Sequence, residues 1–179
     1  MKKHRIFIAL NIDNQLKRKM LNWQEKWPDL EARWTKEANL HLTLAFIGQA
    51  TDEELVEVCQ AVKAVGKNHD CFNVELDRIC YGPPKGRPRM IWARGPINEA
   101  LINLKNDLDS HLSSNFFKKH NRPFRPHLTL ARLKNDKNLP EIEENIDWLF
   151  SVDSIEVMES KLQKEGAQYI ILESVQLGL

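Results

Sequence analysis

The sequence predicts an α+β fold with mostly antiparallel sheets, built as two lobes. The pentapeptide HLTLA occurs twice, at residues 41–45 and 127–131, once in each half of the chain. Strand-like and helix-like segments alternate irregularly, and several neighbouring strand candidates are close enough in sequence to form hairpins. The repeated word predicts that the two lobes are related to each other. Because no low-complexity linker interrupts the 179 residues, we expect residues 1–179 to form a single domain of two lobes.

The first half of the chain combines apolar strand candidates with two helices that have recognisable starts. Asp13 is a suitable N-cap for a helix that Pro28 ends, and Thr51 and Glu54 have the spacing of a capping box for a second helix. Gly48 is expected to end the strand that holds the first HLTLA copy. In this half we expect strands at 5–12, 33–34, 39–47, 72–79 and 89–93, helices at 14–27 and 52–65, and a loop at 81–86.

The second half begins with a helix and ends with a long hairpin. Asn98 precedes four leucines at helical spacing, which predicts a helix that starts there. The segment RPFRP at 122–126 is a stiff approach to the strand that holds the second HLTLA copy. We expect strands at 127–133, 151–162 and 167–177, a turn near 165–166, a loop at 135–140 and a short helix after that loop.

Each HLTLA copy presents one imidazole and one hydroxyl together, because residues two apart on a strand share a face. Two histidines that face a common cleft suit general acid–base chemistry near neutral pH. Cleavage of a phosphodiester needs a base on one side of phosphorus, an acid on the other, and donors for the nonbridging oxygens. His41 and His127 are therefore candidate catalytic residues, and Thr43 and Thr129 are candidate phosphate donors.

The formal net charge of +1 hides a strong asymmetry along the chain. Residues 78–98 hold five Lys and Arg and no acid, and residues 110–135 hold six and again no acid. The remainder of the chain has 15 basic and 25 acidic residues. Basic charge gathered in this way favours an anionic ligand if the two windows share a surface.

Several other classes of site are disfavoured. The three cysteines are odd in number and have no CxxC spacing, which argues against a disulfide scaffold and a structural zinc site and favours free thiols. The sequence has no G-x-S-x-G and no P-loop. The apolar run at 6–10 is too short for a signal peptide, and no run approaches the roughly 18 residues of a membrane helix. We expect a cytoplasmic monomer with no cofactor, no metal and no membrane partner.

The context of the two copies resembles one known family. The segments NLHLTLAFIG at 39–48 and RPFRPHLTLAR at 122–132 resemble the two motifs of the two-histidine (2H) phosphoesterase superfamily. More closely, the chain resembles the RNA 2′,3′-cyclic phosphodiesterases, also called 2′-5′ RNA ligases. The opening strand at 5–10 and the terminal hairpin from 159 to 169 are similar as well, so the likeness covers nearly the whole chain.

The resemblance implies a mechanism and a fold. It implies that His41 is the proton donor, that His127 is the proton acceptor, and that Thr43 and Thr129 bind phosphate oxygens. It also implies a two-lobed fold with a pseudo-twofold axis through a central cleft, and no need for a metal. The implied reaction is hydrolysis of the 2′,3′-cyclic phosphate at RNA termini or on nucleotides to a 2′-phosphomonoester.

One further residue of interest follows each motif histidine by five positions: Phe46 after His41, and Arg132 after His127. In similar proteins, the positions of Phe46 and Arg132 flank the bound base and phosphate, although strict alternation turns both side chains away from the histidines. Phe46 therefore has two interpretations, core packing or base stacking. Arg122 and Arg125 are candidate contacts to the RNA backbone or solvated loop charges. Residues 34 and 92, both tryptophan, are expected in the core.

Other functions share these features. A 2′-5′ phosphodiesterase or an RNA ligase would use the same site on another substrate. A non-catalytic RNA-binding protein would use the cleft without turnover, although the sequence lacks an RNA-recognition signature with exposed aromatic residues.

Overall fold

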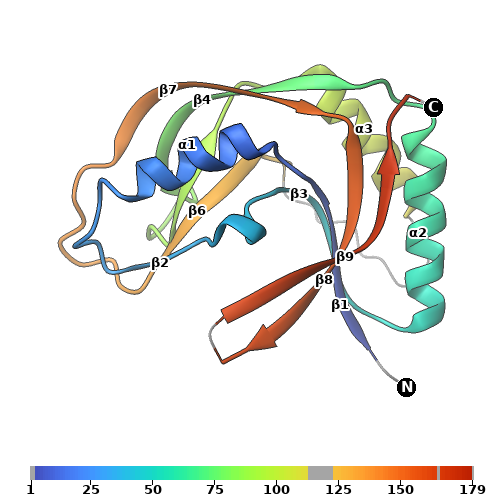
Figure 1. Ribbon diagram of the computed structural model, residues 1–179, viewed down its shortest axis with the longest axis horizontal. Helices are drawn as coiled ribbons and strands as arrows, with labels where there is room; N and C mark the ends of the chain where they lie inside the picture. Colours follow the sequence, from blue (N-terminus) through green and yellow to red (C-terminus); the bar gives the residue numbers. More distant parts are fainter. Residues whose placement is uncertain (1–2, 113–122, 165, 179) are drawn as a thin grey trace.

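The fold is organised around one antiparallel β-sheet, seen in the computed structural model, which describes residues 3–112, 123–164 and 166–178 (Figure 1). The strands are β1 His4–Leu10, β2 Ala32–Trp34, β3 Leu42–Ala50, β4 Phe72–Gly82, β5 Met90–Arg94, β6 His127–Leu133, β7 Glu143–Val152, β8 Ser154–Gln163 and β9 Gly166–Gln176. The helices are α1 Asn14–Gln24, α2 Asp52–Gly66 and α3 Glu99–His111, with a short 3₁₀ turn η1 at Glu37–Asn39. The predicted α+β class with antiparallel pairing is confirmed.

The strands follow the order β7-β4-β5-β6-β3-β1-β8-β9, and β2 pairs with β6 beside this path. The two HLTLA strands, β3 and β6, are neighbours at the middle of the sheet, where Leu42 pairs with Leu128. These leucines are the second residue of each copy, so equivalent positions face each other across an antiparallel pair. The chain reaches each motif strand in a similar way, through β1 and α1 to β3 and through β5 and α3 to β6. The division into two lobes with a central cleft stays a prediction.

The predicted helix starts are confirmed by their caps. The Asp13 carboxylate accepts a hydrogen bond from the backbone N–H of Leu16 at 2.7 Å. Thr51 and Glu54 form the full capping box at the start of α2, and Asn98 caps α3. Each cap satisfies a backbone donor that the first helical turn leaves without a partner.

Several local predictions were wrong. Helix α1 ends at Gln24, before the predicted end at residue 27, and the strand expected at 151–162 is divided at Asp153 between β7 and β8. The short helix expected after residue 140 is instead β7, in which burial alternates over most of the strand and which pairs with β4 at both ends, on either side of one irregularity. Strand β4 extends to Gly82, into the segment expected to be a loop. Strand β3 begins at Leu42, after η1, and passes Gly48 at a φ of +90° before ending at Ala50. The strand therefore continues through a backbone conformation that glycine adopts readily.

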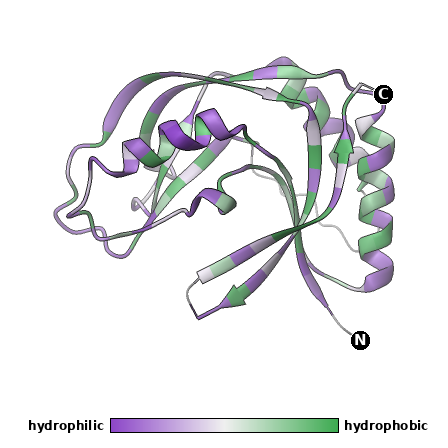
Figure 2. Ribbon diagram, in the orientation of Figure 1, coloured by the Kyte–Doolittle hydropathy of each residue, from purple (hydrophilic) through white to green (hydrophobic). Residues whose placement is uncertain are grey.

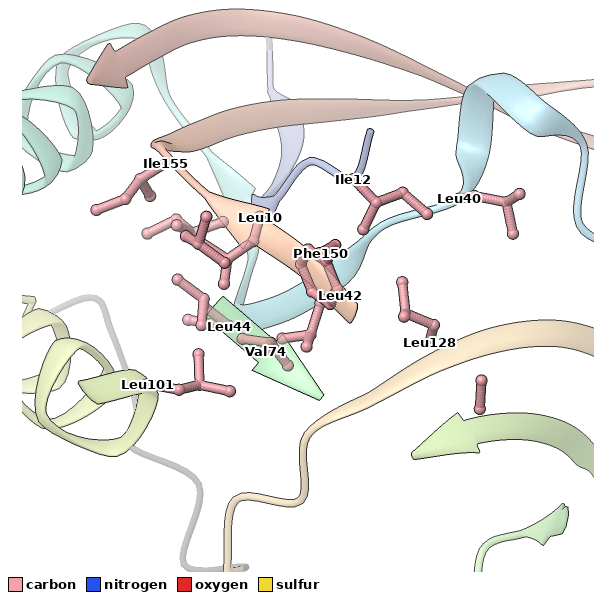
Figure 3. Packing of buried hydrophobic residues seen from close by; sticks show 14 of the residues in the cluster. Leu10, Ile12, Leu40, Leu42, Leu44, Val74, Leu101, Leu128, Phe150 and Ile155 are labelled. Atoms are coloured by element: carbon pink, nitrogen blue, oxygen red, sulfur yellow. The ribbon is translucent and has the colours of Figure 1, made fainter. Parts of the chain in front are cut away.

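All three helices pack against one face of the sheet. Leu42, Leu44, Leu128 and Leu130 of the motif strands belong to the same buried cluster as the apolar residues of α1, α2 and α3. Figure 3 shows Leu42, Leu44 and Leu128 in this cluster, together with Leu101 of α3. Figure 2 shows α1 as largely hydrophilic and α2 as alternating between hydrophobic and hydrophilic residues, as expected for helices with one buried side. Burial of each leucine contributes about 1.5–3 kcal/mol.

Candidate active site

The polar residues of both HLTLA copies lie on the sheet face opposite the helices. We call it the histidine face, and it carries His41, Thr43, His127 and Thr129. The intervening leucines point into the helix-side core, so alternation turns these four side chains the other way. An antiparallel register through the paired leucines sets His41 beside Thr129 and Thr43 beside His127. The four residues that the sequence predicted as one site are thus brought together.

The two imidazoles are oriented by the same device. The Nδ1 of His41 lies 2.7 Å from the carbonyl oxygen of Asn39, and the Nδ1 of His127 lies 2.7 Å from that of Arg125. A carbonyl oxygen only accepts, so each Nδ1 carries the proton and donates it. Each neutral ring therefore offers the lone pair of its Nε2. The Thr43 hydroxyl donates to the Nε2 of His41 at 2.9 Å.

A β-bulge interrupts each motif strand at the same position of the repeat. Strand β1 pairs Ile8 with Ala45 and Ala9 with Thr43, which leaves Leu44 as an extra residue. In the same way, β5 pairs Ile91 with Ala131 and Trp92 with Thr129, which leaves Leu130 as an extra residue of β6. A bulge shifts the alternation of all later side chains by one position.

The bulges bring Phe46 and Arg132 onto the histidine face, although strict alternation predicts the opposite. The burial pattern agrees, because the two residues before each of them are buried and both of them are exposed. Phe46 is 57% exposed, so the core-packing interpretation is wrong. The Arg132 guanidinium reaches the Met90 sulfur at 3.5 Å.

Aromatic rings from β1, β5 and β9 lie against the two histidines. The ring centroids of Phe7 and Tyr169 lie 5.0 and 5.2 Å from that of His41. The Trp92 indole stacks on the His127 ring with centroids 3.9 Å apart and planes 27° apart. Trp92 is buried, as expected, but it is also part of the site. Sequence reasoning missed these three aromatic contacts, because each depends on which strands become neighbours.

Burial lowers the pKa of both histidines. Desolvation is the largest cause and lowers the pKa of His41 to about 4, against the opposing effect of its bond to the Asn39 carbonyl. Desolvation also lowers the pKa of His127. The positive charge of Arg132 lowers both values further, so its guanidinium acts on both imidazoles. Both rings are therefore neutral at pH 7.

The sequence also singled out two loop arginines and a tryptophan, which lie in different places. Arg125 is exposed beside the site, and its carbonyl is the one that orients His127. Arg122 lies outside the described residues. Trp34 is half-buried and packs edge-on against Trp23 of α1.

Two other kinds of site have no candidate in the described part of the chain. Within it, no group of three or more His, Cys, Asp or Glu side chains is arranged to hold a metal ion. No helix within the same ranges has the length and apolar character needed to cross a membrane.

Comparisons with known proteins agree with this arrangement. A family model described as LigT like phosphoesterase matches residues 10–92 and 94–169. The RNA 2′,3′-cyclic phosphodiesterase of Methanocaldococcus jannaschii is 27% identical over 175 residues, covering 94% of this chain and 98% of the relative.

Solved structures share the whole fold. A crystal structure of a Thermus thermophilus protein superposes with a TM-score of 0.87 at 25% identity and covers 97% of each chain. The E. coli LigT complexed with 3′-AMP superposes with a TM-score of 0.85 at 24% identity, covering 98% of this chain and 99% of that one.

Proposed function

Because this chain belongs to the LigT-like phosphoesterase family, we propose that it hydrolyses 2′,3′-cyclic phosphodiesters of RNA termini or nucleotides to 2′-phosphomonoesters. Relatives that carry the name RNA 2′,3′-cyclic phosphodiesterase, such as that of Methanocaldococcus jannaschii, support this substrate class. The observation that carries the proposal is the pair of histidines on one sheet face, each with its Nδ1 bonded to a carbonyl two residues earlier.

In the proposed reaction, His127 is the general base and His41 the general acid. The Nε2 of His127 accepts a proton from water as the water oxygen bonds to phosphorus. The bond from phosphorus to O3′ breaks, and the Nε2 of His41 gives its proton to that oxygen. The product is a 2′-phosphomonoester with a free 3′ hydroxyl. The proton gained by His127 and the proton lost by His41 are exchanged with solvent, which restores the starting state.

The lowered pKa values suit His127 as the base, whereas His41 can act as the acid only after it gains a proton. Burial keeps His127 neutral at pH 7, which is the form a base needs. His41, whose pKa is about 4 in the free site, must gain a proton before it can donate one. The negative charge of a bound phosphate favours the imidazolium and raises that pKa. Substrate binding therefore charges the proton donor.

The neighbouring side chains complete the proposed site. Thr43 and Thr129 donate to the nonbridging oxygens, where charge accumulates in the transition state. Arg132, whose positive charge acts on both histidines, neutralises the same phosphate in this proposal. Phe46, exposed on the same face, offers a ring on which a base can stack for about 1–3 kcal/mol.

The test is hydrolysis of a 2′,3′-cyclic nucleotide by the purified chain, beside a 2′-5′ dinucleotide. We expect a 2′-phosphomonoester as the product and no loss of rate in EDTA. His41→Ala and His127→Ala should each lower kcat by about 10²–10⁴-fold, the usual worth of a positioned acid or base. His111→Ala, at an exposed histidine near the end of α3, is the matched control and should retain the rate.

Each contrary result has its own meaning. Cleavage of the 2′-5′ dinucleotide alone would replace the proposed substrate with that linkage, and sealing of RNA ends alone would indicate a ligase. Binding without turnover would favour an RNA-binding protein. A rate within a few-fold of normal for either motif histidine variant would remove the role assigned to that residue, and loss of rate on chelation would contradict a metal-free mechanism.

A further inference from the structure

We propose that Arg94 binds the internucleotide phosphate on the 5′ side of the cyclic phosphate, so that the chain favours RNA fragments over cyclic mononucleotides. The inference rests on the proposed function and adds a second phosphate subsite to it. A cyclic mononucleotide lacks that phosphate, whereas every longer fragment has it.

Arg94 lies on the histidine face, directly beside a catalytic candidate. It is the last residue of β5 and pairs with His127, while Trp92 of the same strand pairs with Thr129. Residues that pair directly across antiparallel strands project from the same face, with Cβ atoms about 5 Å apart. The Arg94 side chain therefore starts next to the His127 ring, on the side of β6 away from β3.

The Arg94 side chain has no partner within the described residues. Its Nε is buried and makes no hydrogen bond, and neither a hydrogen bond nor an ion pair joins this side chain to another group in those ranges. A buried donor without a partner is costly, and a guanidinium without an anion is more so. An oxyanion bound at Arg94 would remove this cost, and phosphate matches the planar fork of the guanidinium.

The next arginine across the sheet differs in this respect. Arg78 of β4 pairs with Arg94 on the same face, but its Nη1 donates to the Glu143 carboxylate at 2.8 Å. Both arginines belong to the acid-free window at 78–98, and among the described residues only Arg78 of this pair has an ion-pair partner. Strands are spaced about 4.8 Å apart, so Arg94 is one strand and Arg78 two strands from His127.

Arg132 and Arg94 divide two phosphates between them. Arg132 is the arginine whose charge acts on both imidazoles, which assigns it to the reacting phosphate. Arg94 pairs with His127 at one end of the β5–β6 pair, whereas Arg132 pairs with Met90 at the other end, so the two arginines start at opposite ends of this strand pair. An RNA strand that leaves the reacting phosphate over β5 would bring its next phosphate to Arg94.

The experiment compares a 2′,3′-cyclic mononucleotide with a dinucleotide that ends in the same cyclic nucleotide. Arg94→Met should lower kcat/KM for the dinucleotide about tenfold and leave the mononucleotide within about twofold. The dependence of log kcat/KM on log salt for the dinucleotide should lose about 0.7 of slope, the contribution of one contact to single-stranded nucleic acid. Arg94→Lys should keep that slope. Arg18→Met, on an exposed face of α1, removes the same charge and should change neither substrate.

Two kinetic outcomes would overturn the inference. Equal loss on both substrates would show that Arg94 acts on the reacting centre or on the fold, and no loss on either would show that it does not contact RNA. The Kd of the dinucleotide, measured for the same variants, separates this question from the proposed function. If the unsubstituted chain hydrolyses neither substrate, the proposed function fails, and an unchanged Kd in Arg94→Met would overturn the Arg94 subsite by itself.

Discussion

The two motif histidines share a backbone device but differ in what surrounds them. Each donates from Nδ1 to the carbonyl two residues earlier. His41 lies among Phe7 and Tyr169 at tilted and edge-on angles, whereas His127 stacks flat on Trp92. The same backbone hydrogen bond therefore orients both rings, whereas side chains of β1 and β9 surround His41 and a side chain of β5 covers His127.

Gly82 holds the Trp92 indole against His127. A Cβ at position 82 would lie 2.3 Å from the indole Cδ2, so Gly82→Ala must displace the ring and the imidazole stacked on it. Displacement of a catalytic group by about 1 Å can cost about a hundredfold in rate. We expect kcat to fall about tenfold to a hundredfold while KM for the cyclic mononucleotide changes little, as measured by steady-state kinetics.

Gly86→Ala is the control for that variant. A Cβ there meets nothing within 4 Å, and although its φ of +83° makes alanine strained, the strain lies in an exposed loop. It should lower stability without lowering kcat. The double variant Gly82→Ala with Trp92→Phe should recover part of the rate, because the smaller ring leaves room for the methyl group. An unchanged kcat in Gly82→Ala would show that Trp92 does not position His127.

At the scale of elements, the hairpin of β8 and β9 secures the first histidine. Asn39, at the end of η1, donates from its side-chain Nδ2 to the Ala167 carbonyl of β9 at 2.8 Å, and its own carbonyl accepts from His41. Tyr169 of the same strand contacts the His41 ring. The hairpin thus holds both the carbonyl that orients this imidazole and one of the rings beside it.

Asn39→Ala should weaken this connection. The lost hydrogen bond is worth about 1 kcal/mol, so we expect kcat to fall about fivefold as the carbonyl that orients His41 becomes less constrained. Kinetics on the cyclic mononucleotide measure the effect, and thermal unfolding measures the accompanying loss of stability. Asn68→Ala removes a similar bond, to the Ala64 carbonyl on the exposed end of α2, and should leave kcat unchanged. Equal rates for the two variants would contradict the role of the hairpin.

At the scale of the whole molecule, one face of the sheet forms the hydrophobic core and the other carries the candidate catalytic residues. The helices bury one face, and the other carries partly buried ionisable groups. The pKa of His41 is about 4 in the folded protein, below its ordinary value of 6.5, and burial also lowers that of His127. Between pH 4 and 6.5 the unfolded chain therefore binds more protons than the folded one.

Stability should accordingly rise with pH across that window. The contribution of His41 is fully present above pH 6.5 and is lost toward pH 4, with a span of up to about 3 kcal/mol. Denaturant unfolding at pH 4, 5, 6 and 7 measures the slope. The variant His41→Gln cannot titrate and should show a flatter dependence, whereas His111→Ala should keep the original one. Parallel slopes for His41→Gln and the unsubstituted chain would mean that this imidazole titrates normally.

Local chemistry determined a large part of this protein. Several features can be predicted from the sequence because each depends on residues close together in the chain. They are the histidine and threonine pair within each repeat, the three helix caps, the strand at 127–133 and the terminal hairpin. The class of fold follows from the same local patterns.

Tertiary structure decided what depends on partners distant in sequence. Strand β7 forms because β4 pairs with it, the bulges at Leu44 and Leu130 arise from the register with β1 and β5, and Arg94 meets His127 only through strand order. The sequence alone predicts which side chains share a face of a regular strand. Which strand lies alongside, and where one extra residue shifts that alternation, is set by the packing of the whole sheet, because hydrogen bonds and side-chain contacts between strands are satisfied together.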